Sequence, residues 1–277
     1  MIFFYELFNL LCKYKTLNYR KISDTNPSSK GIPAPIGLGN SEDCFACKSC
    51  ERYCPTKAIQ IVSETEIQFD YGACTQCGLC VEICEKEKLE NSGFVNVFAL
   101  NREEFVIRYK NGNFTPKEYP ISPNVENFRK LTKRKGFNFR EIAAGGNNCG
   151  ECEIGASFNN VFDSESEGVK NVASPKHADA IVYTGPISEN MKEPLSIAWN
   201  VMPKPKALIA CGTEAISGGV FTLGERPCEP DLFIAGDPPR PDVSVSAYRL
   251  LMGRIKFSFQ IKFYKRFQEL KERKHER

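Results

Sequence analysis

The fold of the first half of this chain is decided by the stretch Cys44-Phe-Ala-Cys47-Lys-Ser-Cys50-Glu-Arg-Tyr-Cys54-Pro55. A second run with the same spacing follows it, Cys74-Thr-Gln-Cys77-Gly-Leu-Cys80-Val-Glu-Ile-Cys84, and each of its cysteines lies 30 residues after its counterpart (44 to 74, 54 to 84). Two-residue gaps let three thiolates of one run converge on one centre, and the fourth cysteine points away from it. The duplication therefore predicts two matched centres in one small domain.

This pattern resembles the bacterial two-cluster ferredoxin, a protein that holds two [4Fe–4S] clusters. The resemblance implies crossed ligation, in which the fourth cysteine of each run binds the other cluster. The ligands of cluster 1 would be Cys44, Cys47, Cys50 and Cys84, and those of cluster 2 would be Cys74, Cys77, Cys80 and Cys54. Zinc sites pair two C-x₂-C hooks per metal and do not run four cysteines in this way. Glu85 stands where the second run would carry proline, which removes no ligand.

Length and composition limit what the rest of the chain can be. With 277 residues the chain is long enough for two modest domains. Its 13 cysteines lie mostly in tight runs, which favours cluster ligation over a disulfide framework. A net charge of +3 is too small to indicate a nucleic-acid partner. No apolar run approaches the ~18 residues that a membrane span needs, and the apolar start, Met1 to Leu11, predicts a helix that packs on its own domain or against a membrane subunit or lipid.

We expect five segments along the chain. They are an N-terminal segment (1–30), the ferredoxin domain (31–110), a basic linker with one short helix (111–136), a second domain (137–258) and a charged tail, solvated or frayed (259–277). In the second domain, apolar runs at 180–183, 207–210 and 232–235 alternate with helical stretches at 187–201 and 243–255. The fold class is therefore an α+β ferredoxin-like domain followed by an α/β flavodoxin-like domain with a parallel sheet.

Landmarks in the second half carry a second resemblance. In order they are Gly145-Gly146 with Cys149, Cys152 and Glu153; Ser174-Pro175-Lys176-His177-Ala178-Asp179; Thr184-Gly185-Pro186; Met191; Glu193-Pro194-Leu195; Met202-Pro203; Gly218-Gly219-Val220-Phe221; and Pro238-Pro239-Arg240-Pro241. They resemble the small, proximal-cluster subunit of energy-converting membrane-bound [NiFe] hydrogenases and of respiratory complex I. The stretch 101–109 also resembles the segment after the clusters in hydrogenase ferredoxin subunits. In an open parallel sheet such a site lies beyond the carboxyl ends of the strands.

The third cluster that this resemblance implies has an altered ligand set. In the family, the third and fourth ligands are the cysteines of a Gly-Thr/Ser/Asp-Cys-Ala loop and a Gly-Cys-Pro-Pro loop, but here Glu214 and Asp237 stand in their places. Three outcomes are open. The cluster is held by Cys149, Cys152, Glu214 and Asp237; or Cys211 and Cys228 replace the two carboxylates; or the site holds no cluster or a different metal. Carboxylates are harder ligands than thiolates, which would make such a cluster more labile.

Other polar residues point to no further chemistry. We expect His177 to be structural or interfacial, and Arg240 to pair with Asp237, to meet a partner or to lie free on the surface. No nucleophile–base pair or nucleotide-binding loop stands out, and iron through the same cysteines and carboxylates is the metal expected.

The two resemblances together imply an electron-transfer subunit of a hydrogenase-like, complex I-related oxidoreductase, with no complete catalytic site in this chain. Electrons would come from a soluble ferredoxin-type donor and pass through the clusters towards a large catalytic subunit. We expect membrane subunits as further partners, and a cytoplasmic position at the inner face of the cell membrane without a span. The alternatives are a ferredoxin fused to a redox-inactive docking domain, and a related reductase without hydrogen chemistry.

Overall fold

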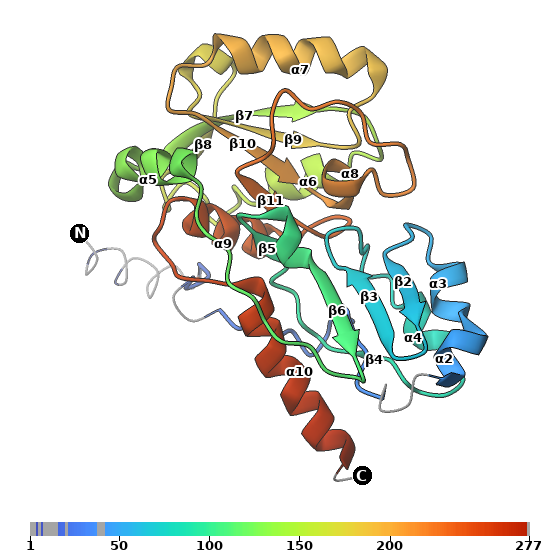
Figure 1. The fold of residues 1–277 in the computed structure, drawn as a ribbon. Helices are drawn as coiled ribbons and strands as arrows, with labels where there is room; N and C mark the ends of the chain where they lie inside the picture. Colours follow the sequence, from blue (N-terminus) through green and yellow to red (C-terminus); the bar gives the residue numbers. More distant parts are fainter. Residues whose placement is uncertain (1–3, 5–6, 8–15, 20–21, 38–41, 276–277) are drawn as a thin grey trace.

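The computed structural model describes residues 4, 7, 16–19, 22–37 and 42–275. The expected N-terminal helix at 1–11 lies outside them except for Phe4 and Leu7. The elements run in the order β1 (Pro33–Ala34), α2 (Glu42–Cys47), α3 (Ser49–Tyr53), β2 (Ile59–Ser63), β3 (Glu66–Asp70), α4 (Leu79–Glu82), β4 (Glu90–Asn91), β5 (Phe98–Ala99), η1 (Arg102–Phe105), β6 (Val106–Lys110), α5 (Pro123–Lys135), β7 (Phe137–Ala143), α6 (Cys149–Ala156), β8 (Val169–Asn171), η2 (Pro175–His177), β9 (Ala180–Thr184), α7 (Glu189–Val201), β10 (Ala207–Cys211), α8 (Thr213–Ser217), β11 (Leu232–Ile234), α9 (Pro241–Leu251) and α10 (Phe259–His275). Mixed helices and sheets thus build the chain, as the sequence predicts (Figure 1).

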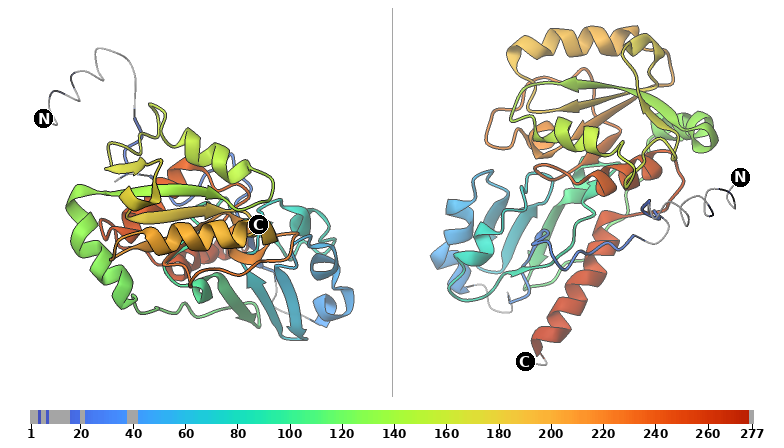
Figure 2. Two further views of the ribbon diagram at one scale, coloured as in Figure 1. Left: turned by 90° about the horizontal axis from the view of Figure 1, so that it is seen from above. Right: turned by 180° about the vertical axis from the view of Figure 1, so that it is seen from behind.

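The second half is built on a six-stranded sheet in the order β5-β11-β10-β9-β7-β8. Five of its strands are parallel, and β5 adds an antiparallel edge. Every residue of β9 and β10 is buried, because helices cover both faces: α7 lies over one, and α5, α6 and α9 cover the other (Figure 2). The strand order reverses between β7 and β9, because β8 lies on one side of β7 whereas β9, β10 and β11 follow on the other. In open parallel sheets, ligands bind at the carboxyl ends of the strands beside such a reversal.

The first half contains a three-stranded antiparallel sheet, β2-β3-β6, and a small β1-β4 pair. Burial alternates along β2 and β3, so one face of the sheet is covered and the other is not. The covered face packs into an aromatic cluster in which the hydroxyls of Tyr71 and Tyr109 lie 2.7 Å apart, and Tyr71 also donates to Pro33 O at 2.9 Å. Their hydrogen bonds satisfy two phenols that are fully buried.

The expected solvated tail is wrong, because α10 is a core element of the first half. Phe259, Phe263, Phe267 and Leu270 are all at most 1% exposed. Their spacing of three and four residues places them on one face of the helix. The Phe263 ring meets that of Tyr71 at 5.1 Å, so the charged residues of α10 form only its outer side. Figure 1 shows α10 (red) running along the ferredoxin sheet.

The two halves interlock at two more points. Strand β5 belongs to the first half of the sequence but pairs with β11 in the large sheet. Helix α5 occupies the second part of the expected linker and buries Val125 and Phe128 on the large sheet's side. Among the described residues, no helix is both long enough and apolar enough to pass through a bilayer.

Candidate redox centres

The cysteine duplication is also a duplication of backbone conformation. Helix α3 begins at Ser49 and α4 at Leu79, 30 residues later, and each follows a residue in the left-handed region, Lys48 (φ 52°) and Gly78 (φ 79°). A second matched pair, Lys57 (φ 54°) and Glu87 (φ 48°), follows the fourth cysteine of each run. Equal spacing and equal conformation place the thiols of the two runs in equivalent positions.

One cavity is lined by cysteines from both runs. Its walls hold Cys54 of the first run together with Cys74, Cys77 and Cys80 of the second, and apolar side chains such as Ile59 complete it. Burial raises the pKa of the Cys74 thiol to about 12, and the neighbouring Cys54 and Cys77 sulfurs also raise it. The backbone hydrogen bond that the Cys74 sulfur accepts has the opposite effect and lowers this pKa. The set expected for cluster 2 is therefore brought together.

The second set surrounds Cys50. Burial raises the pKa of its thiol to about 12, and the neighbouring sulfurs that add to this shift are those of Cys44, Cys84 and Cys47. These are the four cysteines expected for cluster 1. Within each set, three cysteines come from one run and one from the other.

Backbone N–H groups already point at the sulfurs. Ala58 N donates to Cys54 Sγ and Lys88 N to Cys84 Sγ, both at 3.3 Å, and Gln76 N donates to Cys74 Sγ at 3.4 Å. Such bonds stabilise a thiolate over a thiol, and hydrogen bonds to the sulfurs are one means by which a protein tunes a cluster. The residues present therefore fit two thiolate-bound clusters.

Sequence reasoning missed Lys30. Its ammonium donates to Cys77 O at 3.0 Å and pairs with Glu82 at 2.7 Å, although it precedes the first cysteine run. Its methylenes lie over Gly78, where an added Cβ would stand 2.5 Å from Lys30 Cδ. No motif marks this lysine, because its partner lies 47 residues away in the sequence.

The candidate third site lies after the carboxyl end of β7, where Gly145 (φ 108°) and Gly146 (φ 87°) turn the chain. Glu214 Oε2 lies only 1.8 Å from where a Cβ on Gly146 would stand, so a side chain there would displace this carboxylate and would also be strained by the positive φ. Asn147, also missed from the sequence, connects both carboxylates. Its N–H donates to Glu214 Oε2 at 3.3 Å and its Nδ2 donates to Asp237 Oδ1 at 3.1 Å.

Two cysteines of α6 meet these carboxylates. Desolvation raises the pKa of Cys149, and Asp237, Cys152 and Glu214 are the charged neighbours that raise it further. Burial also raises the pKa of Glu214, with Asp237 as the first of the acidic neighbours that contribute. Through Asn147, hydrogen bonds connect the Glu214 and Asp237 carboxylates to the start of α6, the helix that carries Cys149 and Cys152. Within the described residues, no three His, Cys, Asp or Glu side chains lie close enough to hold a single metal ion.

The alternative ligands Cys211 and Cys228 are not part of this group. Cys211 is 1% exposed and faces the core under α9, where it packs with residues such as Tyr248. Cys228 lies in a groove beside Lys206 and Asp231 at the amino ends of β10 and β11, whereas Cys149 follows the carboxyl end of β7. The alternative ligand set is therefore not assembled, because the Cys211 side chain is buried in the core and Cys228 lies at the opposite ends of the strands.

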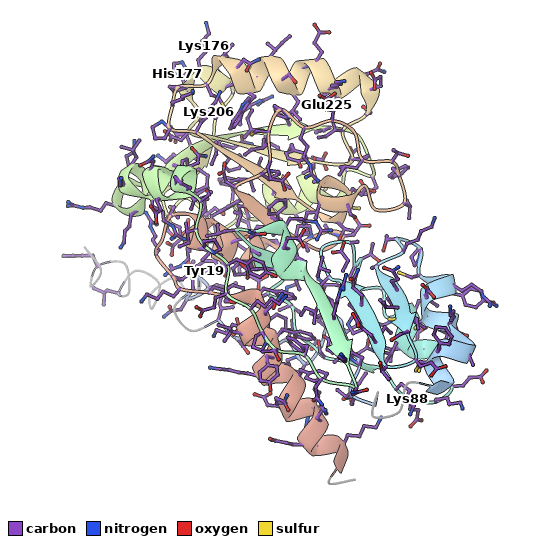
Figure 3. The ribbon with its side chains drawn as sticks, viewed as in Figure 1. Tyr19, Lys88, Lys176, His177, Lys206 and Glu225 are labelled. Carbon is purple, nitrogen blue, oxygen red and sulfur yellow. The ribbon has the colours of Figure 1, made fainter. Side chains whose placement is uncertain are left out.

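The remaining expectations concern His177 and Arg240. His177 is exposed in η2, and Figure 3 shows it with Lys176 beside the end of α7, on the far side of the molecule from Lys88. Arg240 pairs with Asp242, at 2.9 and 3.1 Å, and not with Asp237. Neither residue contributes to the three candidate centres.

The third site touches the cluster-2 loop. Thr213 Oγ1 donates to Cys74 O at 3.1 Å and accepts from Gly236 N at 3.3 Å. Thr213 N also donates to Gly236 O at 2.8 Å. The residues directly after Thr213 and Gly236 are Glu214 and Asp237. One buried hydroxyl therefore joins the loop of a cluster-2 cysteine to both carboxylate-bearing loops.

Comparisons with known proteins agree with this division. Residues 43–88 match the model of the 4Fe-4S dicluster domain, and residues 148–251 match that of the NADH ubiquinone oxidoreductase, 20 Kd subunit. Formate hydrogenlyase subunit 7 of Escherichia coli is 34% identical over 133 residues, 46% of this chain and 52% of the relative, so the chain spans about half of that protein. The probable membrane-bound hydrogenase subunit mbhJ of Pyrococcus furiosus is 31% identical over 142 residues, 49% of this chain and 84% of the relative. A chain of a solved membrane-bound sulfane sulfur reductase, an archaeal respiratory complex, aligns at 21% identity and a TM-score of 0.39 over 53% of this chain and 89% of that chain, too weakly to support an argument.

Proposed function

This chain belongs to the family of the NADH ubiquinone oxidoreductase 20 Kd subunit, and we propose that it is a three-centre electron relay in a membrane-associated, hydrogenase-like complex. In the proposal, cluster 1 is held by Cys44, Cys47, Cys50 and Cys84, cluster 2 by Cys74, Cys77, Cys80 and Cys54, and a third centre by Cys149, Cys152, Glu214 and Asp237. The single observation that supports it is the cavity that Cys54 of the first run lines together with Cys74, Cys77 and Cys80 of the second. Bound clusters would supply one-electron transfer.

The order of the centres follows from contacts between their loops. The Thr213–Cys74 hydrogen bond supports cluster 2 as the neighbour of the third site. Cluster 1 then lies at the far end of the relay, where Cys47 is exposed beside the exposed ring of Phe45. A soluble ferredoxin-type donor would deliver electrons there, and each electron would move on through cluster 2.

The exit of the relay would face a large catalytic subunit. Val220 and Phe221 are 63% and 51% exposed, and they follow Gly219, which packs against Glu214. Adjacent exposed apolar side chains next to a candidate redox site are a plausible contact for a partner protein. The name of the Pyrococcus relative, a probable membrane-bound hydrogenase subunit, supports a hydrogenase-like complex at a membrane. In the proposal, a large subunit and membrane subunits are the partners, and this chain is bound peripherally on the cytoplasmic side.

The fold labels and boundaries of the two halves belong to this proposal. The five parallel strands follow the order 2-1-3-4-5 when numbered along the chain, which supports a flavodoxin-like second domain. The duplicated cysteine runs with a small antiparallel sheet support a ferredoxin-like first domain. We place the domain boundary before α5, and we assign α10 to the first domain because its buried face covers the ferredoxin sheet.

The hydrogen bonds that connect Asn147 to Glu214, to Asp237 and to Cys149 N favour a redox-active second half over a docking domain without a redox centre. Anaerobic redox titration of the full chain, followed by EPR, tests the function. The proposal predicts two cluster signals that disappear with the cysteines of the two runs, and a further signal that disappears when Cys149 and Cys152 are replaced by alanine. A protein without any reducible iron–sulfur signal would overturn it.

A further inference from the structure

Thr213 precedes Glu214, at the Thr/Ser/Asp position of the family's Gly-Thr/Ser/Asp-Cys-Ala loop, and that motif does not reveal what its hydroxyl binds. Its side chain is fully buried. Its hydroxyl donates a hydrogen bond to Cys74 O and accepts one from Gly236 N–H. Both partners are backbone groups, so their positions depend on the fold and not on side-chain rotamers. Gly212 (φ 103°) turns the chain directly after β10 and so places Thr213 at this junction.

Each branch of the junction leads directly to a candidate ligand. From the Cys74 thiolate, covalent bonds lead to the Cys74 carbonyl oxygen. A hydrogen bond then joins this oxygen to the Thr213 hydroxyl. From Thr213, one peptide bond leads to Glu214, and a hydrogen bond to Gly236 followed by one peptide bond leads to Asp237. The path from Cys74 therefore crosses one hydrogen bond to reach Glu214 and two hydrogen bonds to reach Asp237.

We propose that the Thr213 hydroxyl is the bridge for electron transfer from cluster 2 to the third centre. The inference rests on the proposed function and adds a positioning residue to it. With clusters bound, one electron would leave the centre held by Cys54, Cys74, Cys77 and Cys80, and the same electron would reduce the third centre. No bond would form or break and no proton would move. The hydroxyl acts by holding two loops in hydrogen-bonded contact, since a hydrogen bond couples donor and acceptor more strongly than a van der Waals gap.

The two cysteine runs also differ in the hydrogen bonds that the carbonyl groups of their first cysteines accept. Cys44 is the counterpart of Cys74, and its carbonyl accepts the N–H of Lys48 within its own loop. The cluster-2 loop is instead held from outside the repeat, by Thr213 at Cys74 O and by Lys30 at Cys77 O. These contacts place the cluster-2 loop, rather than the cluster-1 loop, at the junction with the third site.

The test compares Thr213→Val with Thr213→Ser in the full chain. Valine keeps the shape but lacks the hydroxyl, whereas serine keeps the hydroxyl. Thr132→Val is the matched control, because Thr132 is also a buried threonine, whose hydroxyl donates to Phe128 O within α5, far from the junction. After flash reduction, freeze-quenched samples are followed by EPR for the rate at which the third-centre signal rises. Hydrogen exchange of the Gly236 amide gives a second readout that needs no metal.

We expect Thr213→Val to slow the rise of the third-centre signal several-fold and to speed exchange at Gly236, with unchanged iron content and an unchanged rate of cluster-1 reduction. Thr213→Ser and Thr132→Val should both resemble the wild type. An unchanged transfer rate in Thr213→Val, with the third centre loaded, would overturn the bridge and leave the relay intact. A wild-type chain without any third-centre signal would overturn the third centre itself, and the bridge with it.

Discussion

The side-chain amide of Asn147 donates a hydrogen bond to the carboxylate of Asp237, with Nδ2 and Oδ1 3.1 Å apart. The same residue donates its N–H to Glu214 and accepts the N–H of Cys149 with its Oδ1 at 3.0 Å. Asn147 therefore fixes three of the four candidate donors of the third site. This gives a physical reason why the buried Glu214 carboxylate and the exposed Asp237 carboxylate can both lie at this loop.

Replacing Asn147 should loosen the third site without affecting the other two. In Asn147→Ala the Asp237 carboxylate loses its donor, and the start of α6 loses a hydrogen bond worth about 1 kcal/mol. We expect the third-centre iron to be lost faster to a chelator, while the two ferredoxin clusters persist. Asn159→Ala is the control, because Asn159 accepts similar backbone bonds at the other end of α6. Equal iron loss from the two variants would contradict the role of Asn147.

Crossed ligation predicts which cysteine pairs belong to one cluster. Cys54 and Cys74 lie in one set although they come from different runs, whereas Cys54 and Cys44 share a run but not a set. The double variant Cys54→Ser/Cys74→Ser should lose one cluster, about four irons, and Cys54→Ser/Cys44→Ser should lose two, about eight. Iron analysis and EPR check this. The opposite pattern would show that each run binds its own cluster.

Glu104 should make the stability of the first half depend on pH. Burial raises the pKa of this carboxyl from 4.5 to about 7, even though it accepts the N–H of Phe259 at the start of α10. The folded chain therefore holds a proton that the unfolded chain releases, so stability is lost as pH rises from about 4.5 to about 7 and is flat above that. We expect Glu104→Gln to be more stable than the wild type near pH 8 by about 1–3 kcal/mol and equal to it near pH 4.5.

Thermal unfolding of the full chain at both pH values measures this difference. Glu103→Gln is the matched control, since Glu103 is the exposed neighbour in the same turn. The control should follow the wild type at every pH. If the stability of Glu104→Gln changed with pH in the same way as that of the wild type, a buried, protonated Glu104 would be contradicted.

Helix α10 should be necessary for the stability of the ferredoxin half. Phe263 is fully buried and packs edge-on against both Tyr71 and Phe94. Phe263→Ala should cost about 3–5 kcal/mol, as is typical for a buried phenylalanine. Phe221→Ala, at an exposed position, should change stability by no more than about 0.5 kcal/mol. Denaturant unfolding followed by cluster absorbance compares them, and equal midpoints would mean that α10 is not part of this core.

The sequence predicts those parts of the structure that depend on local spacing. The strands at 180–184, 207–211 and 232–234 appear where apolar runs indicate them, and the cysteine runs form two sets. The helical stripe from Phe259 to Leu270 is also visible in the sequence, but its charged residues favoured a solvated tail. Only the three-dimensional fold reveals that an aromatic sheet face, far away in sequence, is its partner.

Long-range contacts account for the rest of what the sequence did not predict. Lys30, Asn147 and Thr213 act through hydrogen bonds to residues 47, 90 and 139 positions away. None of them stands at a ligand position of the expected patterns, since each holds a ligand loop in place. The choice between Glu214 with Asp237 and Cys211 with Cys228 likewise depends on which edge and face of the sheet each residue occupies.

The most direct test of the three-centre relay is anaerobic iron and acid-labile sulfide analysis of the full chain beside its Cys149→Ala/Cys152→Ala variant. The relay predicts about twelve irons in the wild type and about eight in the variant, with the EPR signals of the two ferredoxin clusters unchanged. About eight irons in both proteins would contradict the third centre and leave two clusters as the whole redox equipment of the chain.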